Sequence, residues 1–326
     1  MYKFEPHDGC SPLRRFIALP TETLLIMGAR RVPPILCPAA NTNTAISVLT
    51  SVGFRRLEVN DYMMATKRLK PDIVVGLGDI VQTHKHGKNR KQRMSDRTAD
   101  WTRKIANDSK AGDGVARVAT SSFLAPILPI DRESQSYYLD QLADELRERI
   151  SGLAIYDTKS LIELPESLHQ LPRLSFAEPS CPNQVLHEIS LGMDLTIIPF
   201  IGAATDAGIA LEFSFPAPNR HTTLRARQPL GIDMWTSTHA TDLSPLRTGC
   251  SCYACAKHHR AYVQHLLSAK EMLGWILLQI HNHRVMDEFF AGIRDSIRRG
   301  CFDEDRREFG AAYEPELPEK TGQGPR

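Results

Sequence analysis

Three cysteines within six residues constrain this chain more than any other feature of its sequence. Cys250, Cys252 and Cys255 follow the pattern CxCxxC. Thiolates at this spacing select zinc or an iron–sulfur group, and structural zinc takes four nitrogen or sulfur ligands in tetrahedral geometry. Reduced thiols packed as small apolar side chains are the alternative, which the polar flanks of the three cysteines disfavour. We therefore predict a zinc site that needs one further ligand.

Histidines downstream offer that fourth ligand: His258, His259, His265, His281 and His283. The first two follow Cys255 so closely that the backbone would have to turn very tightly. His265 lies ten residues after Cys255. His281 lies beyond an amphipathic segment, and its return to the cysteines would pin a helix against them. The spacing alone does not choose among these histidines.

Short apolar runs alternate with amphipathic stretches through the first two thirds of the chain. We expect strands at residues 24–27, 72–75, 115–119, 152–156, 173–176 and 195–198. We expect helices at residues 62–69, 96–107, 134–150 and 183–191. This alternation is typical of βαβ units and a parallel sheet. The pattern does not separate an open doubly wound sheet from a closed barrel.

The pattern changes after residue 209. Residues 210–215 and 231–235 alternate like the two strands of a hairpin, with a polar loop between them. Residues 258–299 are almost free of Pro and Gly and predict at least two helices. Within them, Met272, Leu273, Ile276 and Ile280 recur at helical spacing, which favours a face buried in the core.

Charge and composition exclude several classes of protein. Lys plus Arg number 40 against 38 Asp plus Glu, so bulk charge does not hold this chain on nucleic acid. Without an apolar leader or a long apolar run, and with seven cysteines, we expect a soluble intracellular protein lacking disulfides.

Residues 84–97 carry six basic side chains against Asp96, a local excess that predicts either phosphate contacts or a solvated face. Arg294, Arg298 and Arg299 form a second, smaller basic group with the same two readings.

The zinc motif extends into longer runs on both sides. Asp-Leu-Ser-Pro-Leu precedes it at residues 242–246, Arg-Ala-Tyr-Val-Gln-His-Leu-Leu follows at 260–267, and His281-Asn282 completes the region. This order resembles the C-terminal zinc subdomain of the tRNA-guanine transglycosylase family. The resemblance implies one structural Zn²⁺ per subunit, with the ligands Cys250, Cys252, Cys255 and His281.

Weaker similarity continues upstream. Residues 71–79 resemble the family's barrel strand that ends in a base-binding aspartate, here Asp79, and residues 190–195 resemble the lead into its catalytic strand. The implied fold class is α/β, a TIM-type (β/α)₈ barrel with a C-terminal zinc-binding subdomain. On this interpretation, residues 1–230 form a barrel with short or missing early strands. Residues 231–310 form the zinc-binding and helical subdomain, and residues 311–326 form a disordered tail.

Departures from the family pattern fall on its catalytic residues. The family uses an aspartate nucleophile at a strand end, and Ile197 stands at the corresponding position. The base-binding glutamine is missing from residues 125–129, where the chain reads Ala-Pro-Ile-Leu-Pro. Tyr156 replaces a glycine of the base-recognition turn and is expected to fill the pocket. These changes predict a pseudoenzyme with no catalytic residues.

A chain that keeps the family's zinc motif but has other residues at its catalytic positions resembles the family's non-catalytic eukaryotic subunit. The resemblance implies a heterodimer whose catalytic subunit exchanges guanine for queuine at the wobble position of tRNAs with a GUN anticodon. In the family, surfaces around the zinc subdomain also form the subunit interface, so the resemblance offers contact with the partner as the alternative for part of the apolar area at residues 269–280. It also implies a cytoplasmic protein, without a membrane span, that associates peripherally with the mitochondrial outer membrane. Two alternatives remain at this point. One is an active transglycosylase with a relocated carboxylate such as Asp194 or Asp206, and the other is a stand-alone zinc-dependent RNA-binding protein.

Overall fold

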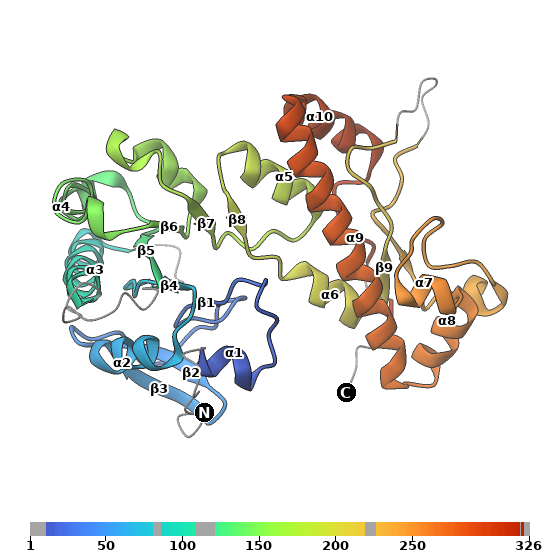
Figure 1. The fold of residues 1–326 in the computed structure, drawn as a ribbon, viewed down its shortest axis with the longest axis horizontal. Coiled ribbons are helices and arrows are strands. Elements are labelled where there is room, and N and C mark those ends of the chain that lie inside the picture. The colour runs from blue at the N-terminus through green and yellow to red at the C-terminus, as the bar shows by residue number, and fades with distance from the viewer. Residues whose placement is uncertain (1–10, 81–85, 109–120, 219–225, 320, 323–326) are drawn as a thin grey trace. The chain divides into compact units, whose positions relative to one another are not determined.

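The computed structural model describes residues 11–80, 86–108, 121–218, 226–319 and 321–322 (Figure 1). Close contacts divide the chain into two compact units. Unit 1 comprises residues 1–178 and 191–197, and unit 2 comprises residues 179–190 and 198–326. The segment 179–190 belongs with the C-terminal half although it lies within the run of alternating strands and helices, so the division does not follow chain order.

Unit 1 is built on a parallel sheet in which the described residues form six strands. Their order is β1 (Ile26–Met27), β4 (Ile73–Val75), β5 (Ser122–Ile127), β6 (Gly152–Ile155), β7 (Arg173–Ser175) and β8 (Leu195–Thr196). Every neighbouring pair is parallel. The parallel α/β sheet predicted from the sequence is confirmed. The sheet is a curled half-barrel with β1 and β8 at its edges, and among the described residues it does not close into the expected eight-stranded barrel.

Successive residues of these strands face opposite sides of the sheet, as strand geometry requires. Val74, Phe123 and Leu153 join the core beneath the covering helices. Val75, Leu124 and Ala154 form an apolar layer on the other face. Both faces are therefore buried, which explains why these strands appear in the sequence as short continuous apolar runs.

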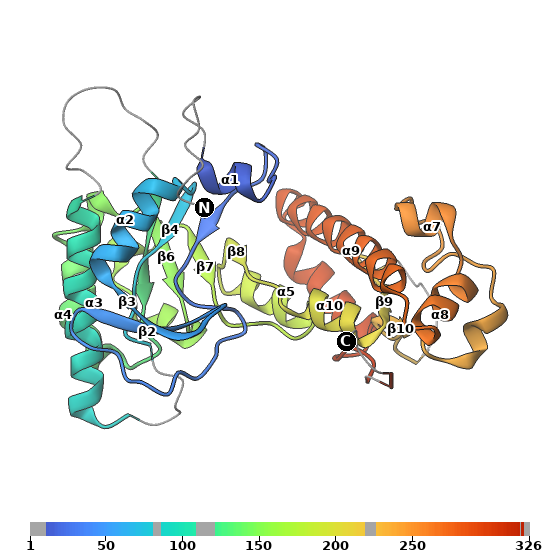
Figure 2. The same cartoon turned by 90° about the horizontal axis from the view of Figure 1, so that it is seen from below.

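The helices of unit 1 are α1 (Pro12–Phe16), α2 (Val59–Leu69), α3 (Lys88–Asp108) and α4 (Arg132–Ala143). The last two lie side by side against the sheet, as both views show (Figures 1 and 2). Gly152 lies at a close approach between strands, because a Cβ atom there would meet the carbonyl oxygen of Pro172 at 2.6 Å. Tight packing of this kind explains a glycine at the start of β6.

Several details of unit 1 differ from the sequence prediction. An antiparallel hairpin of β2 (Ala45–Thr50) and β3 (Gly53–Glu58) precedes α2 and was not predicted. The helix expected at residues 134–150 ends at Ala143, and a 3₁₀ turn follows at Arg147–Arg149. The strand predicted at residues 115–119 lies outside the described residues, and β5 provides the neighbouring strand of the sheet.

Unit 2 combines a short hairpin with helices. The predicted hairpin is confirmed, since β9 (Ile209–Leu211) pairs antiparallel with β10 (Gly231–Asp233). The helices are α5 (Pro182–Ser190), α6 (Phe200–Ala207), α7 (Tyr253–Lys257), α8 (Arg260–Ser268), α9 (Met272–Arg299) and α10 (Phe302–Ala312). The sequence predicted at least two helices within residues 258–299, and α8 and α9 are these helices.

Aromatic side chains form the centre of one core in unit 2. The ring of Phe213 makes edge-to-face contacts with Phe289, Phe309 and Tyr313 at centroid distances of 5.4–6.5 Å. Gly292 allows α9 to approach this core closely, because a Cβ atom there would lie 1.9 Å from the carbonyl oxygen of Phe215. Tyr313 is only 3% exposed, so ordered packing continues past residue 311, where the disordered tail was expected to begin.

The sequence predicted that the apolar row after residue 269 is buried in the core, and this prediction is wrong. Met272 is 74% exposed, Ile276 49% and Ile280 39%. The opposite stripe of α9 is the buried one, and it includes Trp275 and Leu278. The first part of α9 therefore carries apolar residues on two faces, one in the core and one on the surface of unit 2. No helix in the described part of the chain is long and apolar enough to cross a membrane.

Candidate metal centre and strand-end cavity

The three clustered cysteines and one distant histidine come together in unit 2. Cys250 and Cys252 precede α7, Cys255 lies within it, and His281 lies in the third turn of α9. Their four potential ligand atoms all lie within 4.8 Å of one another. The Nδ1 atom of His281 is 3.8, 3.7 and 3.4 Å from the sulfur atoms of Cys250, Cys252 and Cys255.

These separations match the edges of a zinc tetrahedron. With Zn–S bonds of about 2.3 Å and a Zn–N bond of about 2.05 Å, tetrahedral angles place sulfur and nitrogen about 3.6 Å apart. Three thiolates and one imidazole also form a donor set that favours zinc over hard cations. The residues present therefore fit a four-coordinate structural zinc ion.

Hydrogen bonding sets the tautomer of His281. Its Nε2 atom lies 3.0 Å from the carbonyl oxygen of Leu211, which can only accept a hydrogen bond, so Nε2 carries the proton. The lone pair of Nδ1 is then directed at the cysteines. Burial also lowers the pKa of His281 to about 4, which keeps the imidazole neutral near pH 7.

Without a bound cation, burial shifts the pKa values of the cysteines upward, whereas it shifts the pKa of His281 downward. Burial raises the pKa of Cys255 to about 12, and the neighbouring thiols of Cys252 and Cys250 act in the same direction. Burial likewise raises the pKa of Cys250. Three thiolates at this separation repel one another, so a bound cation is what makes the deprotonated cluster favourable.

Arg260 holds the segment that leads into the cysteines. Its side chain donates to the carbonyl oxygens of Pro245 and Leu246 at 3.1 Å each and to Oδ2 of Asp242 at 3.3 Å. The backbone amide of Ala261 donates to the carbonyl oxygen of Asp242 at 2.8 Å. The two runs that flank the CxCxxC pattern are therefore one hydrogen-bonded structure that supports the metal centre.

The other candidate histidines lie outside the cluster. The ring of His258 stacks on Tyr262 with centroids 5.0 Å apart, and Nδ1 of His259 accepts from the amide of Tyr262 to cap α8. His265 is exposed. His283 is also exposed and bonds to Gln279.

Ile197 follows β8 in unit 1 and is half-buried. It packs against the apolar layer that contains Leu174, Ala154 and Val75. Asp194 lies three residues before Ile197 in the chain. Its side chain accepts a hydrogen bond from the backbone amide of Arg173 at 2.9 Å and so joins the amino ends of β7 and β8. Asp206 lies exposed on α6 in unit 2, and its carbonyl oxygen accepts from Trp275.

Asp79 follows β4 and is fully buried. Its Oδ1 atom accepts from Asn41 at 2.7 Å and from Arg90 at 2.8 Å, and Oδ2 accepts from Arg97 at 3.0 Å. A carboxylate held by two guanidinium groups and an amide has little capacity left for a ligand. In this structure Asp79 neutralises part of the charge of α3.

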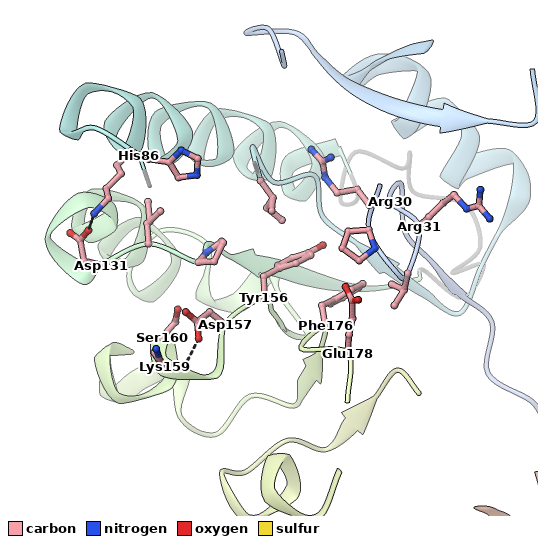
Figure 3. A pocket seen from close by; sticks show the side chains of 16 residues that line it. Arg30, Arg31, His86, Asp131, Tyr156, Asp157, Lys159, Ser160, Phe176 and Glu178 are labelled. Atoms are coloured by element: carbon pink, nitrogen blue, oxygen red, sulfur yellow. Dashed lines mark hydrogen bonds and ion pairs between the residues drawn. The ribbon is translucent and has the colours of Figure 1, made fainter. Parts of the chain in front are cut away.

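A cavity of about 720 Å³ lies at the carboxyl ends of the strands of unit 1 (Figure 3). Tyr156 follows β6, and its ring stacks on Phe176 at a centroid distance of 4.5 Å and an angle of 15°. The tyrosine lies along the wall of the cavity, so the expectation that it would fill the pocket is wrong. Burial raises the pKa of Tyr156 to about 12, against the opposing charge of Arg30.

The described basic residues of the segment 84–97 divide between internal contacts and solvent. Arg90 and Arg97 reach inward to Asp79. Lys91 pairs with Asp131, and Lys88 lies 3.8 Å from Glu133. Lys85 lies outside the described residues. On α9, Arg298 and Arg299 both pair with Asp295, at 3.0 and 2.9 Å.

Among the lining residues that the sequence analysis did not assign to a pocket are Arg30 and Phe176. Arg30 follows a strand of only two residues, and nothing in its local sequence marks it. Phe176 ends the predicted strand 173–176, where its position at a strand end was the one available signal. Both lie in the cavity because distant strands end side by side.

Comparison with known proteins gives a consistent result. Residues 5–315 match the family model described as queuine tRNA-ribosyltransferase. The chain is 36% identical to queuine tRNA-ribosyltransferase accessory subunit 2 of Schizosaccharomyces pombe, over 96% of this chain and 70% of that protein. It is 28% identical to the proteins of the same name from Anopheles gambiae and Xenopus tropicalis, over 91% and 88% of this chain and 72% and 77% of theirs.

Proposed function

The chain belongs to the queuine tRNA-ribosyltransferase family, and on that premise we propose that it is the non-catalytic accessory subunit of a heterodimeric enzyme. In this proposal the catalytic subunit exchanges guanine for queuine at the wobble position of tRNAs with a GUN anticodon. This chain supports that subunit and the binding of its tRNA. The name shared by the relatives from S. pombe and A. gambiae supports the accessory role.

The apolar surroundings of Ile197 carry the proposal. Covalent base exchange needs a carboxylate at a strand end that is free to attack the ribose. Ile197 instead packs with Leu174 and Ala154. Asp194 is engaged by the amide of Arg173, and this contact argues against a relocated nucleophile there.

We assign a structural role to zinc held by Cys250, Cys252, Cys255 and His281. Four protein ligands complete a tetrahedral shell and leave no open position for a substrate, as is typical of structural zinc sites. Bound zinc supplies four bonds that join the loop at residues 250–255 to α9. The binding free energy thereby contributes to the folding of unit 2.

We further propose that the six parallel strands belong to a TIM-type (β/α)₈ barrel, as in the family. Residues 1–230 would supply the barrel and residues 231–310 the zinc-binding and helical subdomain. The parallel order of the strands and the cavity at their carboxyl ends support this assignment.

The exposed apolar residues of α9 are our candidate contact surface for the catalytic subunit. Met272, Ile276 and Ile280 lie four residues apart and form one row along the helix. Apolar side chains gathered in a row on a surface favour burial against a partner. Ile280 directly precedes the proposed ligand His281, so the rigid metal centre would hold the row in place.

A base-exchange assay tests the proposal. Labelled guanine in a cognate tRNA would be followed with this chain alone, with the catalytic subunit alone, and with both. We expect exchange only when the catalytic subunit is present, and fastest in the mixture. Exchange by this chain alone would overturn the non-catalytic role. A mixture no faster than the catalytic subunit alone would overturn the supporting role.

A further inference from the structure

A small polar pocket of about 230 Å³ lies in unit 2 at the end of β9. Three stretches of the chain line it: residues 212–214 after β9, residues 228–229 before β10, and residues 247–248 ahead of the clustered cysteines. Tyr313, which follows α10, also lines it. None of these residues belongs to unit 1, so this pocket is separate from the strand-end cavity.

Hydrogen bonds hold the walls of the pocket in place. The backbone amide of Gln228 donates to the carbonyl oxygen of Ala312 at 2.9 Å, and the carbonyl oxygen of Gln228 accepts from the amide of Glu314 at 2.8 Å. The phenol oxygen of Tyr313, a side chain only 3% exposed, accepts from the amide of Ser214 at 3.2 Å. The pocket is therefore formed before any ligand enters, as is usual for small-molecule sites.

Glu212 is the one acidic side chain that lines this pocket. Its Oε1 atom lies 3.9 Å from Nη2 of Arg260, a long separation for an ion pair. The same guanidinium lies closer to Asp242, with Nη1 at 3.3 Å from Oδ2. Burial raises the pKa of Glu212, against the opposing charges of Arg260 and Arg247, so the negative charge is incompletely compensated. A cation in the pocket would relieve that cost.

Arg247 is the one basic side chain that lines the pocket, and its charge is also shared. Its Nη1 atom donates to Oε2 of Glu288 at 2.8 Å, while Oε1 of the same carboxylate accepts from Arg284 at 2.8 Å. One carboxylate thus answers two guanidinium groups. Within the described part of the chain, the other two nitrogens of the Arg247 side chain donate no hydrogen bond. A carboxylate group of a ligand fits such guanidinium donors.

The pocket therefore presents one partly compensated charge of each sign. A zwitterion answers both charges and leaves the net charge of the site unchanged. An ammonium group also has three hydrogen atoms to donate. Besides Glu212, the hydroxyl groups of Ser214 and Thr248 and the side-chain amide of Gln228 line the pocket and offer acceptors for them.

We propose that this pocket binds a free α-amino acid, with its ammonium group against Glu212 and its carboxylate against Arg247. The pocket is smaller than the range of about 300–1,000 Å³ that is usual for drug-sized ligands, which favours an amino acid with a small side chain. Phe213 and Pro229 give that side chain apolar surface. The proposal does not rest on the accessory role, since the site needs neither the catalytic subunit nor tRNA.

Isothermal titration calorimetry of the zinc-loaded full chain tests the proposal with L-alanine, ethylamine and propionate. Ethylamine lacks the carboxylate of L-alanine, and propionate lacks its ammonium group, while both keep a small apolar part. We expect L-alanine to bind at least about tenfold more tightly than either, because two charge-assisted contacts combine in one ligand.

Glu212→Gln and Arg247→Gln should each weaken the binding of L-alanine about tenfold, because each removes one of the two charges. Their matched controls are Glu308→Gln and Arg294→Gln, at exposed positions of α10 and α9 outside the pocket. The side chain of Glu212 is 40% exposed, so its variant keeps the test informative if Arg247→Gln lowers the melting temperature.

Three results would overturn the proposal. The first is that L-alanine does not bind at millimolar concentration. The second is that ethylamine or propionate binds as tightly as L-alanine. The third is that Glu212→Gln, or a folded Arg247→Gln, binds L-alanine like its control. Since the titration contains neither tRNA nor the catalytic subunit, each of these results leaves the proposed accessory function standing.

Discussion

The Nε2 atom of His281 lies 3.0 Å from the carbonyl oxygen of Leu211, and this hydrogen bond joins α9 to β9. The next residue, Asn282, accepts from the amide of Leu211 at 2.9 Å. Two successive side chains of α9 therefore bind both backbone groups of one strand residue. A metal ion on His281 would hold the cysteine loop, the helix and the hairpin of unit 2 in a single arrangement.

Loss of one proposed zinc ligand should destabilise unit 2. We expect Cys252→Ala to abolish bound zinc and to lower the free energy of unfolding by roughly 3 kcal/mol or more, a fall in Tm of roughly 6–12 °C. Elemental analysis and thermal unfolding would measure the two effects. Cys301→Ser is the control, because Cys301 is a half-buried free cysteine outside the cluster. Full zinc content in Cys252→Ala would rule out the proposed ligand set.

Titration of His281 should make the metal-free protein sensitive to mild acid. Burial lowers the pKa of His281 from 6.5 to about 4, so the unfolded chain takes up a proton in this range before the folded chain does. The free energy of unfolding should therefore fall as the pH drops from about 6.5 to 4, by roughly 3 kcal/mol in total. Urea unfolding at several pH values would measure it.

His281→Gln removes that titrating group and should flatten the pH dependence by this amount, whereas His283→Gln should retain it because His283 is exposed. Equal pH profiles for the wild type and His281→Gln would contradict the assignment of a buried neutral imidazole.

Asp79 should be essential for stability. In Asp79→Asn, the side chains of Arg90 and Arg97 lose their shared counter-charge while the shape of the site is kept. We expect a loss of about 3–5 kcal/mol in the free energy of unfolding, as for other broken buried ion pairs. The additional change Arg90→Met should recover part of that loss. Asp96→Asn, at an exposed position of α3, should have little effect. Additive losses in the double variant would show that the charges do not interact.

The apolar row of α9 should be needed for assembly and dispensable for folding. We expect Ile276→Asp to weaken association with the catalytic subunit by about 100-fold, because a charge at the centre of an apolar interface is buried without a partner. Its Tm should stay within a few degrees of the wild type, since Ile276 is exposed in the free chain. Ile297→Asp is the matched control, an exposed isoleucine near the other end of α9. Equal affinities of the two variants would exclude the row as the interface.

The parallel sheet could be predicted because its strands are buried on both faces. Residues 72–75 and 152–156 appear as short continuous apolar runs, which the flanking helical patterns distinguish from helices. The β2–β3 hairpin escaped prediction because one of its strands, Gly53–Glu58, is mostly exposed and carries two arginines. Its pairing depends on contacts that the local pattern does not contain.

Sequence patterns were least informative where apolar residues lie both in the core and on the surface of the same helix. The exposed Ile276 and the buried Leu278 are both apolar residues of one helix, and spacing alone does not tell which stripe faces the core. The cysteines were evident from their spacing, but spacing left His281 as one of several histidines. Its place beside them follows from the packing of α9 against β9, which is a long-range contact.

The most direct test of the account is base exchange by a heterodimer in which only the catalytic subunit has been inactivated. Its nucleophilic aspartate would be replaced by asparagine, the mutant would be assembled with this chain, and release of labelled guanine from a cognate tRNA would be measured. We predict no exchange above background, with full activity restored when the wild-type catalytic subunit is used. Sustained exchange by the complex with the inactivated subunit would contradict the account, because the nucleophile would then have to belong to this chain.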